Sequence, residues 1–159
     1  MNRFIYILLL ILSLVSCFNY SFTGGGLPGI NSIAIPIADD KTNEFQLREK
    51  VTNSLIDKFM QDGNLKIENI NASDSILRCT IQSISDRSAT IDRNEVASQF
   101  ELNISVSLVL EDRKTGKTII KKSVRGQSNY TDLSERNQAI EEAIDKLTTD
   151  ILEEIISAW

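Results

Sequence analysis

The feature that most constrains the fold is a strict alternation of apolar and polar side chains over residues 99–110. A period of two places successive side chains on opposite faces of a β-strand. One set would face a core and the other would face water. The apolar set is Phe100, Leu102, Ile104, Val106, Leu108 and Leu110, and the polar set is Gln99, Glu101, Asn103, Ser105 and Ser107. The chain therefore predicts a sheet with one buried and one polar face.

Shorter runs of the same kind predict further strands, at residues 32–37, 65–67, 76–84 and 118–125. Pro36 cannot donate to a strand ladder, so the first of these is expected at a sheet edge or to end there. Residues 112–117 read as a hairpin turn, in which Gly116 can adopt the positive φ that tight turns need. The strand after this turn has apolar residues on both sides, so its buried face stays undecided. Residues 85–97 read as a charged connection.

Two amphipathic helices are predicted. The first would run from an N-cap at Asn43, with Gln46 three residues later, to a stop at Gly63. The second would begin at Asp132 or Ser134, with Glu135 completing a capping box. The apolar stripe of the first holds Phe45, Leu47, Val51, Leu55, Ile56, Phe59 and Met60, and that of the second holds Ile140, Ala143, Ile144, Leu147, Ile151 and Ile155.

Taken together, the order of elements is strand, helix, several strands, helix. Strands joined by hairpins with one apolar face, plus two amphipathic helices, predict an α+β fold. We expect a two-layer sandwich in which both helices pack on one face of a mixed, mostly antiparallel sheet of about four strands. Residues 32–159 would form this single domain.

The N-terminus predicts a bacterial lipoprotein signal peptide over residues 1–16. Arg3 precedes an apolar run at 4–12, and Leu14-Val15-Ser16 brings small residues to the position before Cys17. An uncleaved membrane anchor is the alternative, but the run is roughly a dozen residues against the ~20 that span a bilayer. Cys17 is therefore the predicted lipidation site. Several acyl chains on it would make membrane attachment nearly permanent.

Residues 17–31 are rich in glycine and predict a lipidated, flexible tether. Its apolar residues Tyr20, Phe22 and Leu27 would lie on the domain or contact the membrane or a partner. Phe18 stands where an inner-membrane retention signal places Asp. In a bacterium with two membranes, the expected location is the outer membrane, on its periplasmic side.

Charge and composition exclude several classes of function. Removal of Arg3 with the signal leaves 16 basic against 22 acidic residues, so a general nucleic-acid binder is not expected. Cys79 would have no disulfide partner and reads as a small buried hydrophobe. The chain contains no histidine, which excludes Ser-His-Asp and Cys-His catalysis and removes the commonest transition-metal ligand. No cofactor is predicted.

Several segments resemble one family over essentially the whole mature chain. The first is the lipobox, Leu14-Val15-Ser16-Cys17, with the residues that follow it to Pro28. The others are Ile33-Ala34-Ile35-Pro36, Asp92-Arg93-Asn94 before the long strand, the turn at 112–116, and a final helix ending in tryptophan. In this order they resemble LptE-type lipopolysaccharide-assembly lipoproteins. The resemblance implies a non-enzymatic outer-membrane lipoprotein. Its partner would be a β-barrel translocon of the LptD type, which it would help to deliver lipopolysaccharide to the outer leaflet.

The hairpin around the turn carries a concentration of positive charge. We expect it to contact lipid A phosphates or the partner, because Lys supplies point charges and Arg can bind phosphate with two donors. A solvated hairpin whose lysines protect a sheet edge is the alternative. The candidate residues are Arg113, Lys114, Lys117, Lys121, Lys122 and Arg125.

Two other functions stay open at this point. Envelope lipoproteins that start with a similar strand also include activators of peptidoglycan synthases and secretion-type lipoproteins. An envelope hydrolase with paired carboxylates would need two of them at a suitable separation. Carboxylates in expected loops are Asp39, Asp40, Asp86, Asp92 and Glu95, and their spacing specifies no pair.

Overall fold

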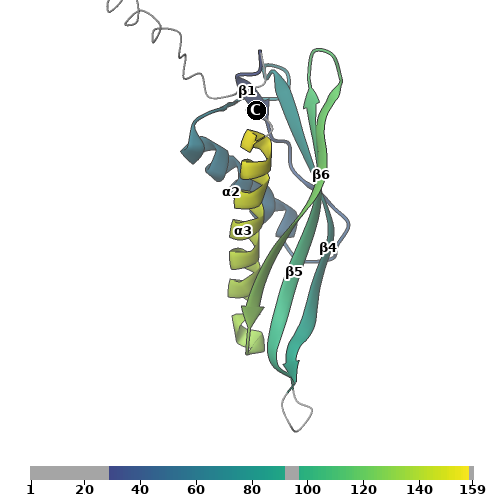
Figure 1. The fold of residues 1–159 in the computed structure, drawn as a ribbon, viewed down its shortest axis with the longest axis vertical. Coiled ribbons are helices and arrows are strands. Elements are labelled where there is room, and N and C mark those ends of the chain that lie inside the picture. Colours follow the sequence, from purple (N-terminus) through teal and green to yellow (C-terminus); the bar gives the residue numbers. More distant parts are fainter. Residues whose placement is uncertain (1–28, 92–96, 158–159) are drawn as a thin grey trace, which may run out of the picture.

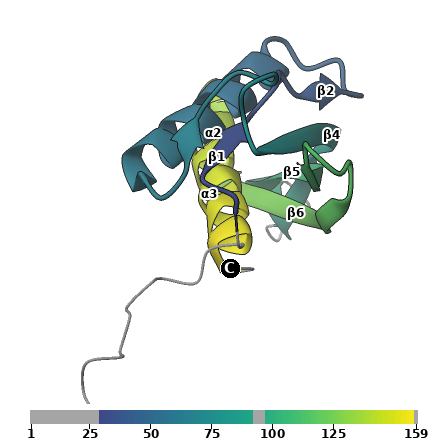
Figure 2. The same cartoon turned by 90° about the horizontal axis from the view of Figure 1, so that it is seen from above.

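A six-stranded mixed sheet carries both helices on one of its faces (Figures 1 and 2). The computed structural model describes residues 29–91 and 97–157. The strand order is β3-β1-β4-β5-β6, and β2 pairs with β4 beyond the end of β1. The strands are β1 Ser32–Ala34, β2 Asp39–Asp40, β3 Lys66–Ile67, β4 Ser75–Ile91, β5 Ala97–Asp112 and β6 Thr118–Tyr130, and the helices are α2 Leu47–Asp62, the 3-10 turn η2 Leu133–Glu135 and α3 Arg136–Ser157.

The predicted α+β class is confirmed, but the predicted number of about four strands was wrong, because the sheet has six. The sheet gains β2, where Asp39 and Asp40 pair in parallel with Thr80 and Ile81 of β4. The sequence reads as an acidic loop there. A strand of two residues is too short to show a period, so no pattern could reveal it.

The antiparallel strands β4, β5 and β6 make up most of the sheet. On β5, the side chains of Leu102, Ile104, Val106, Leu108 and Leu110 are fully buried, which confirms the predicted alternation. β4 continues to Ile91, and its residues Ser85 and Arg87 pair with Asn103 and Glu101. The predicted connection over 85–97 was therefore wrong for 85–91. Residues 85–88 lack apolar alternation, and they are partly or fully exposed, so this part of the hairpin covers little of the core.

β1 lies in the interior of the sheet, paired in parallel with β3 on one side and β4 on the other. It ends at Ala34, two residues before Pro36, so the proline marks the end of the strand as expected. The alternative expectation of an edge strand was wrong. Ser32, Ile33 and Ala34 are all buried, which fits a strand in the interior of the sheet.

The N-cap of α2 lies three residues later than predicted. Gln46 occupies it in a left-handed conformation with φ 57° and its side chain makes no capping hydrogen bond, so the cap at Asn43 was wrong. The C-terminal stop is confirmed, because Gly63 has φ 72° and its N–H donates to Phe59 over 3.1 Å.

Most of the predicted stripe of α2 faces the core. Leu47, Val51, Leu55 and Phe59 are buried. Phe45 and Met60 are not part of the stripe, since they are 80% and 64% exposed. Phe45 precedes the helix, which moves it out of the helical period.

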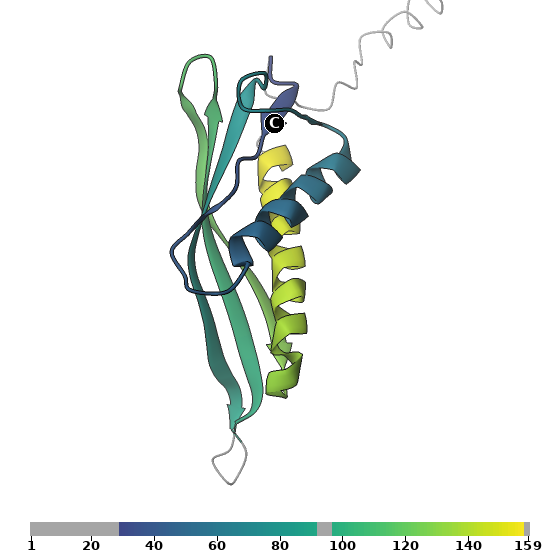
Figure 3. The same ribbon diagram turned by 180° about the vertical axis from the view of Figure 1, so that it is seen from behind.

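α3 has the predicted start and the predicted buried face. Asp132 accepts from the Ser134 N–H while Glu135 reaches back to the backbone of the cap, which confirms the capping box. All six predicted stripe residues are buried. The helix lies along β6 and β5, and α2 packs across it (Figure 3).

Gly126 of β6 permits the close approach of α3. A Cβ at this position would overlap the backbone carbonyl of Ala143 and lie 2.6 Å from the Cβ of Leu147. The neighbouring inward-facing residues Ile120, Ser128 and Tyr130 are buried as well. This settles the buried face of the strand, which the sequence left undecided.

No helix within residues 29–91 and 97–157 is long and apolar enough to cross a bilayer. The predicted signal peptide, Cys17 and the tether residues Tyr20, Phe22 and Leu27 lie outside the described residues. The segment Asp92-Arg93-Asn94 lies outside them too.

Candidate binding surface

The face of β4, β5 and β6 that points away from the helices is polar and partly exposed. Residues paired directly across an antiparallel ladder share a face. Ser105 of β5 pairs with Ser83 on one side and Arg125 on the other, and Asn103 pairs with Ser85 and Gln127. Rows of small hydroxyl and amide side chains therefore cross the sheet, and we call this surface the open face.

A shallow groove of about 260 Å³ runs along the open face. Hydroxyl and amide groups line most of it, and the guanidinium-bearing side chains Arg87 and Arg125 come from opposite strands of the three. Within the lining, Asn103 donates to Glu101 over 2.7 Å. The lining residues are Ser83, Ser85, Arg87, Glu101, Asn103, Ser105, Arg125 and Gln127.

The six basic residues of the predicted hairpin do not form one patch. Lys121 and Arg125 pair with Val109 and Ser105, which places both on the open face. Lys122 pairs with the buried Leu108, so it points to the helix side, where it bonds Glu154 of α3.

The turn that begins the hairpin is fixed to the rest of the domain. Arg113 donates from its side chain to the Ser73 carbonyl and from its backbone to the Asp74 carbonyl. Lys114 forms an ion pair of 3.2 Å with Asp74. Both side chains therefore hold the turn in place, whereas no ion pair is found for Lys117 among the described residues.

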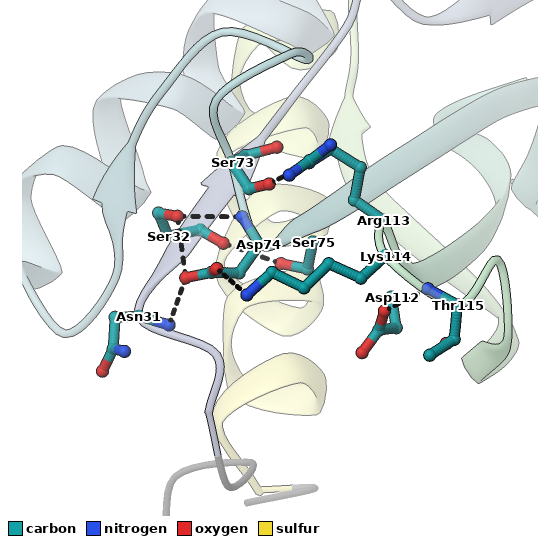
Figure 4. A network of polar contacts seen from close by, with 9 residues as sticks. All are labelled: Asn31, Ser32, Ser73, Asp74, Ser75, Asp112, Arg113, Lys114 and Thr115. Atoms are coloured by element: carbon teal, nitrogen blue, oxygen red, sulfur yellow. Dashed lines mark hydrogen bonds and ion pairs between the residues drawn. The ribbon is translucent and has the colours of Figure 1, made fainter.

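Asp74 is the centre of this network, which we call the Asp74 clasp (Figure 4). Its carboxylate accepts from the Asn31 N–H and the Ser32 hydroxyl, each over 3.1 Å, and from Lys114. The Asn31 N–H contributes most to lowering the pKa of this carboxyl, followed by Lys114. The clasp therefore joins the start of β1 to the turn between β5 and β6.

A second polar cluster surrounds Arg136, the first residue of α3. Its guanidinium donates to both carboxylate oxygens of Glu44 over 3.1 and 2.9 Å, and to Asp86 over 3.1 Å. Asp86 also accepts from the Tyr130 hydroxyl over 3.0 Å. Because all the charged groups are paired, this cluster is a structural connection between α3, β4, β6 and the segment before α2.

The described carboxylates that were considered for hydrolysis lie in strands and not in the expected loops. Asp39 and Asp40 lie in β2, and Asp86, expected in a loop, lies in β4 bonded to Arg136. Asp92 and Glu95 lie outside the described residues. Within residues 29–91 and 97–157, no three metal-ligating side chains lie together.

The prediction that Cys79 is a small buried hydrophobic residue is confirmed. Its side chain is buried on the helix side of β4. Burial raises the pKa of the thiol to about 12. A thiol in this state is a packing group with little thiolate to react.

Ser85 and Arg87 of β4 are groove residues that the sequence did not predict. They come from the stretch read as a connection, and their pairing with Asn103 and Glu101 brings them onto the open face. The available signal was the long alternation of β5, which indicates that a neighbouring strand extends alongside it.

Comparisons with known proteins agree on the fold. The rare lipoprotein B from Shewanella oneidensis is 15% identical, with a TM-score of 0.59, covering 80% of this chain and 95% of that one. A minor lipoprotein from Acinetobacter baumannii is 14% identical, with a TM-score of 0.54 and coverage of 80% and 94%. A PelC dodecamer from Paraburkholderia phytofirmans is 12% identical, with a TM-score of 0.57 and coverage of 84% and 93%.

At these identities the structures show a shared fold, and the fold alone. No curated protein sequence matches the chain. The family model for lipopolysaccharide assembly, LptE, matches residues 30–158, which include all the described strands and helices. The chain therefore belongs to the LptE lipopolysaccharide-assembly family.

Proposed function

We propose that this chain is a non-catalytic outer-membrane lipoprotein that partners a β-barrel translocon of the LptD type in delivering lipopolysaccharide to the outer leaflet. The observation that carries the proposal is the family match across residues 30–158. The lipobox before Cys17 supports attachment to the membrane, on the periplasmic side. In this arrangement the signal peptide ends at residue 16 and residues 17–31 tether the domain over 32–159.

The open face is the surface best suited to contact the barrel. Membrane barrels have a polar interior, and the groove on the open face presents hydroxyl, amide and guanidinium groups.

The first test is capture of partners with the full lipidated chain from detergent-solubilised membranes of its native host. We expect recovery of a large outer-membrane barrel, and about tenfold less of it with Ser105→Trp, which fills the groove. Asn53→Trp on the exposed side of α2 is the matched control and should leave recovery unchanged. Recovery of a peptidoglycan synthase or a secretion machine in place of a barrel would contradict the proposal.

Lipopolysaccharide would be bound by the basic residues of the hairpin that form no ion pair with the described part of the chain. Lys121 and Arg125 lie on the open face, and Lys117 lies at the turn. By contrast, Arg113, Lys114 and Lys122 bond Ser73, Asp74 and Glu154. The first three residues are therefore the better candidates of the six.

The second test compares two variants with the same change of charge. We expect Lys121→Gln with Arg125→Gln to weaken binding of purified lipopolysaccharide to the full chain about tenfold, since each charge-assisted phosphate contact is strong. Lys114→Gln with Lys122→Gln should change it less than about twofold, because both side chains are already paired. Equal losses in the two variants would show that only net charge matters.

A further inference from the structure

β6 is the last strand on one side of the sheet, and no strand of the described residues pairs with its outer backbone edge. The strand order ends at β6. Within the described part of the chain, no backbone hydrogen bond outside the regular ladders involves residues 119–129. A free edge presents unpaired N–H and C=O groups and can pair with another extended chain.

A groove of about 420 Å³ follows this edge, between β6 and the C-terminal half of α3. Residues 123–125 form the side that belongs to β6, with Val124 facing the helix. Asp150, Glu153, Glu154 and Ser157 form the side that belongs to α3. An added strand would therefore have a place beside β6 and a helix above it.

Charges of opposite sign lie on the two sides of this edge. The helix side is acidic, since Asp150 and Glu153 carry no ion pair among the described residues, while Glu154 is bonded to Lys122. The open-face side is basic, because Lys121 and Arg125 point there. Successive side chains of an added strand would point alternately to these two sides.

We propose that the β6 edge accepts an extended segment of a different protein as an added strand. Backbone hydrogen bonds to β6 would hold the segment, and alternate side chains would give specificity. The charges of the edge define the segment: basic or apolar residues at positions that face α3, and acidic or hydroxyl residues at the positions between them. This surface lies at the sheet edge, and the proposal does not depend on the function proposed above.

A second copy of this chain fits the edge poorly. Antiparallel pairing of two β6 strands about a twofold axis would bring the Asp150 and Glu153 side of one α3 toward the same side of the other. It would also place Lys121 and Arg125 of one copy close to the same residues of its partner. Like charges across a strand pair are unfavourable, so a partner with complementary charge is preferred.

The probe is a synthetic peptide with the repeat Lys-Asp-Val-Thr, fluorescently labelled, with the full lipidated chain in detergent micelles. We expect saturable binding by anisotropy, together with slower hydrogen exchange at the outer amides of β6. Asp150→Lys with Glu153→Lys should weaken binding about tenfold. Asp57→Lys on α2 is exposed and is the control for a general change in charge, with an effect below about twofold.

Two control peptides separate strand addition from simple ion pairing. One has the same composition in blocks of like residues, and the other carries N-methyl groups on the amides that would face β6. Both should bind at least about tenfold more weakly than the alternating peptide. Equal binding of either control, or unchanged exchange at β6, would overturn the proposal. So would self-association of the chain without peptide that is lost in the Asp150 and Glu153 variant.

Discussion

Neighbouring residues of β5 face two different environments. Ile104 is fully buried beneath the helices, whereas Ser105 lies partly exposed on the open face and pairs with Ser83 and Arg125. The same backbone ladder supports both. On the helix side, the burial of apolar surface holds the sheet and the helices together. On the open face, small polar side chains contact water and bury little apolar surface. The difference indicates that apolar burial stabilises the fold from one side of the sheet and leaves the side chains of the other side partly exposed.

The sharpest test of this contrast is Ile104→Ala against Ser105→Ala. Truncation of the fully buried Ile104 should lower the free energy of unfolding by about 4 kcal/mol, from lost burial and the cavity left behind. Ser105→Ala should change it by less than about 0.5 kcal/mol. Urea unfolding of the two variants measures the difference. Similar losses in both would show that the open face also carries packing energy.

Gly126→Ala tests how closely the helix layer fits the sheet. A single methyl group at this position overlaps the Ala143 carbonyl, so α3 must move away from β6. We expect a loss of about 3 kcal/mol in the free energy of unfolding, measured in the same way. Ser123→Ala, on the same strand but facing away from α3, is the control and should be neutral.

Arg136→Ala tests whether a polar cluster can hold the layers as packing does. Its side chain is 26% exposed and forms two hydrogen bonds with Glu44 and two with Asp86. We expect a loss of about 2 kcal/mol. Arg136→Lys should recover less than half of it, because Lys lacks the planar pair of donors. Arg48→Ala, in an exposed pair with Glu49, should cost below about 0.5 kcal/mol.

The smallest effect is expected at the Asp74 clasp and depends on pH. Donors from Asn31 and Lys114 lower the pKa of Asp74 in the folded protein. A carboxylate with a lowered folded-state pKa stabilises the fold above its unfolded pKa of about 3.9, and this contribution is lost as pH falls through the lower value. Stability measured by urea unfolding should therefore decline below about pH 4, and Asp74→Asn should reduce that slope. An unchanged slope in the variant would exclude Asp74 as its source.

The two faces also differ in how far the sequence could predict them. Burial leaves a period, so the alternation around Ile104 and the stripe of α3 were readable without a structure. The arrangement of polar side chains on the surface depends on which strands pair and in which register. Alternation places Lys121 and Lys122 on opposite faces of the hairpin, but only the register shows that Lys121 lies on the open face and that Lys122 faces α3, where it bonds Glu154.

Short or exposed elements were missed for related reasons. β2 is too brief to carry a period, and residues 85–88 of β4 are partly or fully exposed and cover little of the core. α2 starts from the left-handed Gln46 in place of a side-chain cap at Asn43. That start depends on how the preceding segment is held, where Glu44 bonds Arg136 from the far end of the chain.

The interior position of β1 has a mechanical consequence. Backbone N–H groups of Lys66 and Glu68 donate to Asn31 and Ile33, each over 3.0 Å, while β4 pairs along the opposite side of the same strand. A force applied through the N-terminal chain, along the strand direction, must shear both ladders together and cannot peel them open bond by bond. We expect single-molecule pulling from this end to need a greater rupture force than pulling β6 outward from its free edge. Equal rupture forces would contradict this expectation.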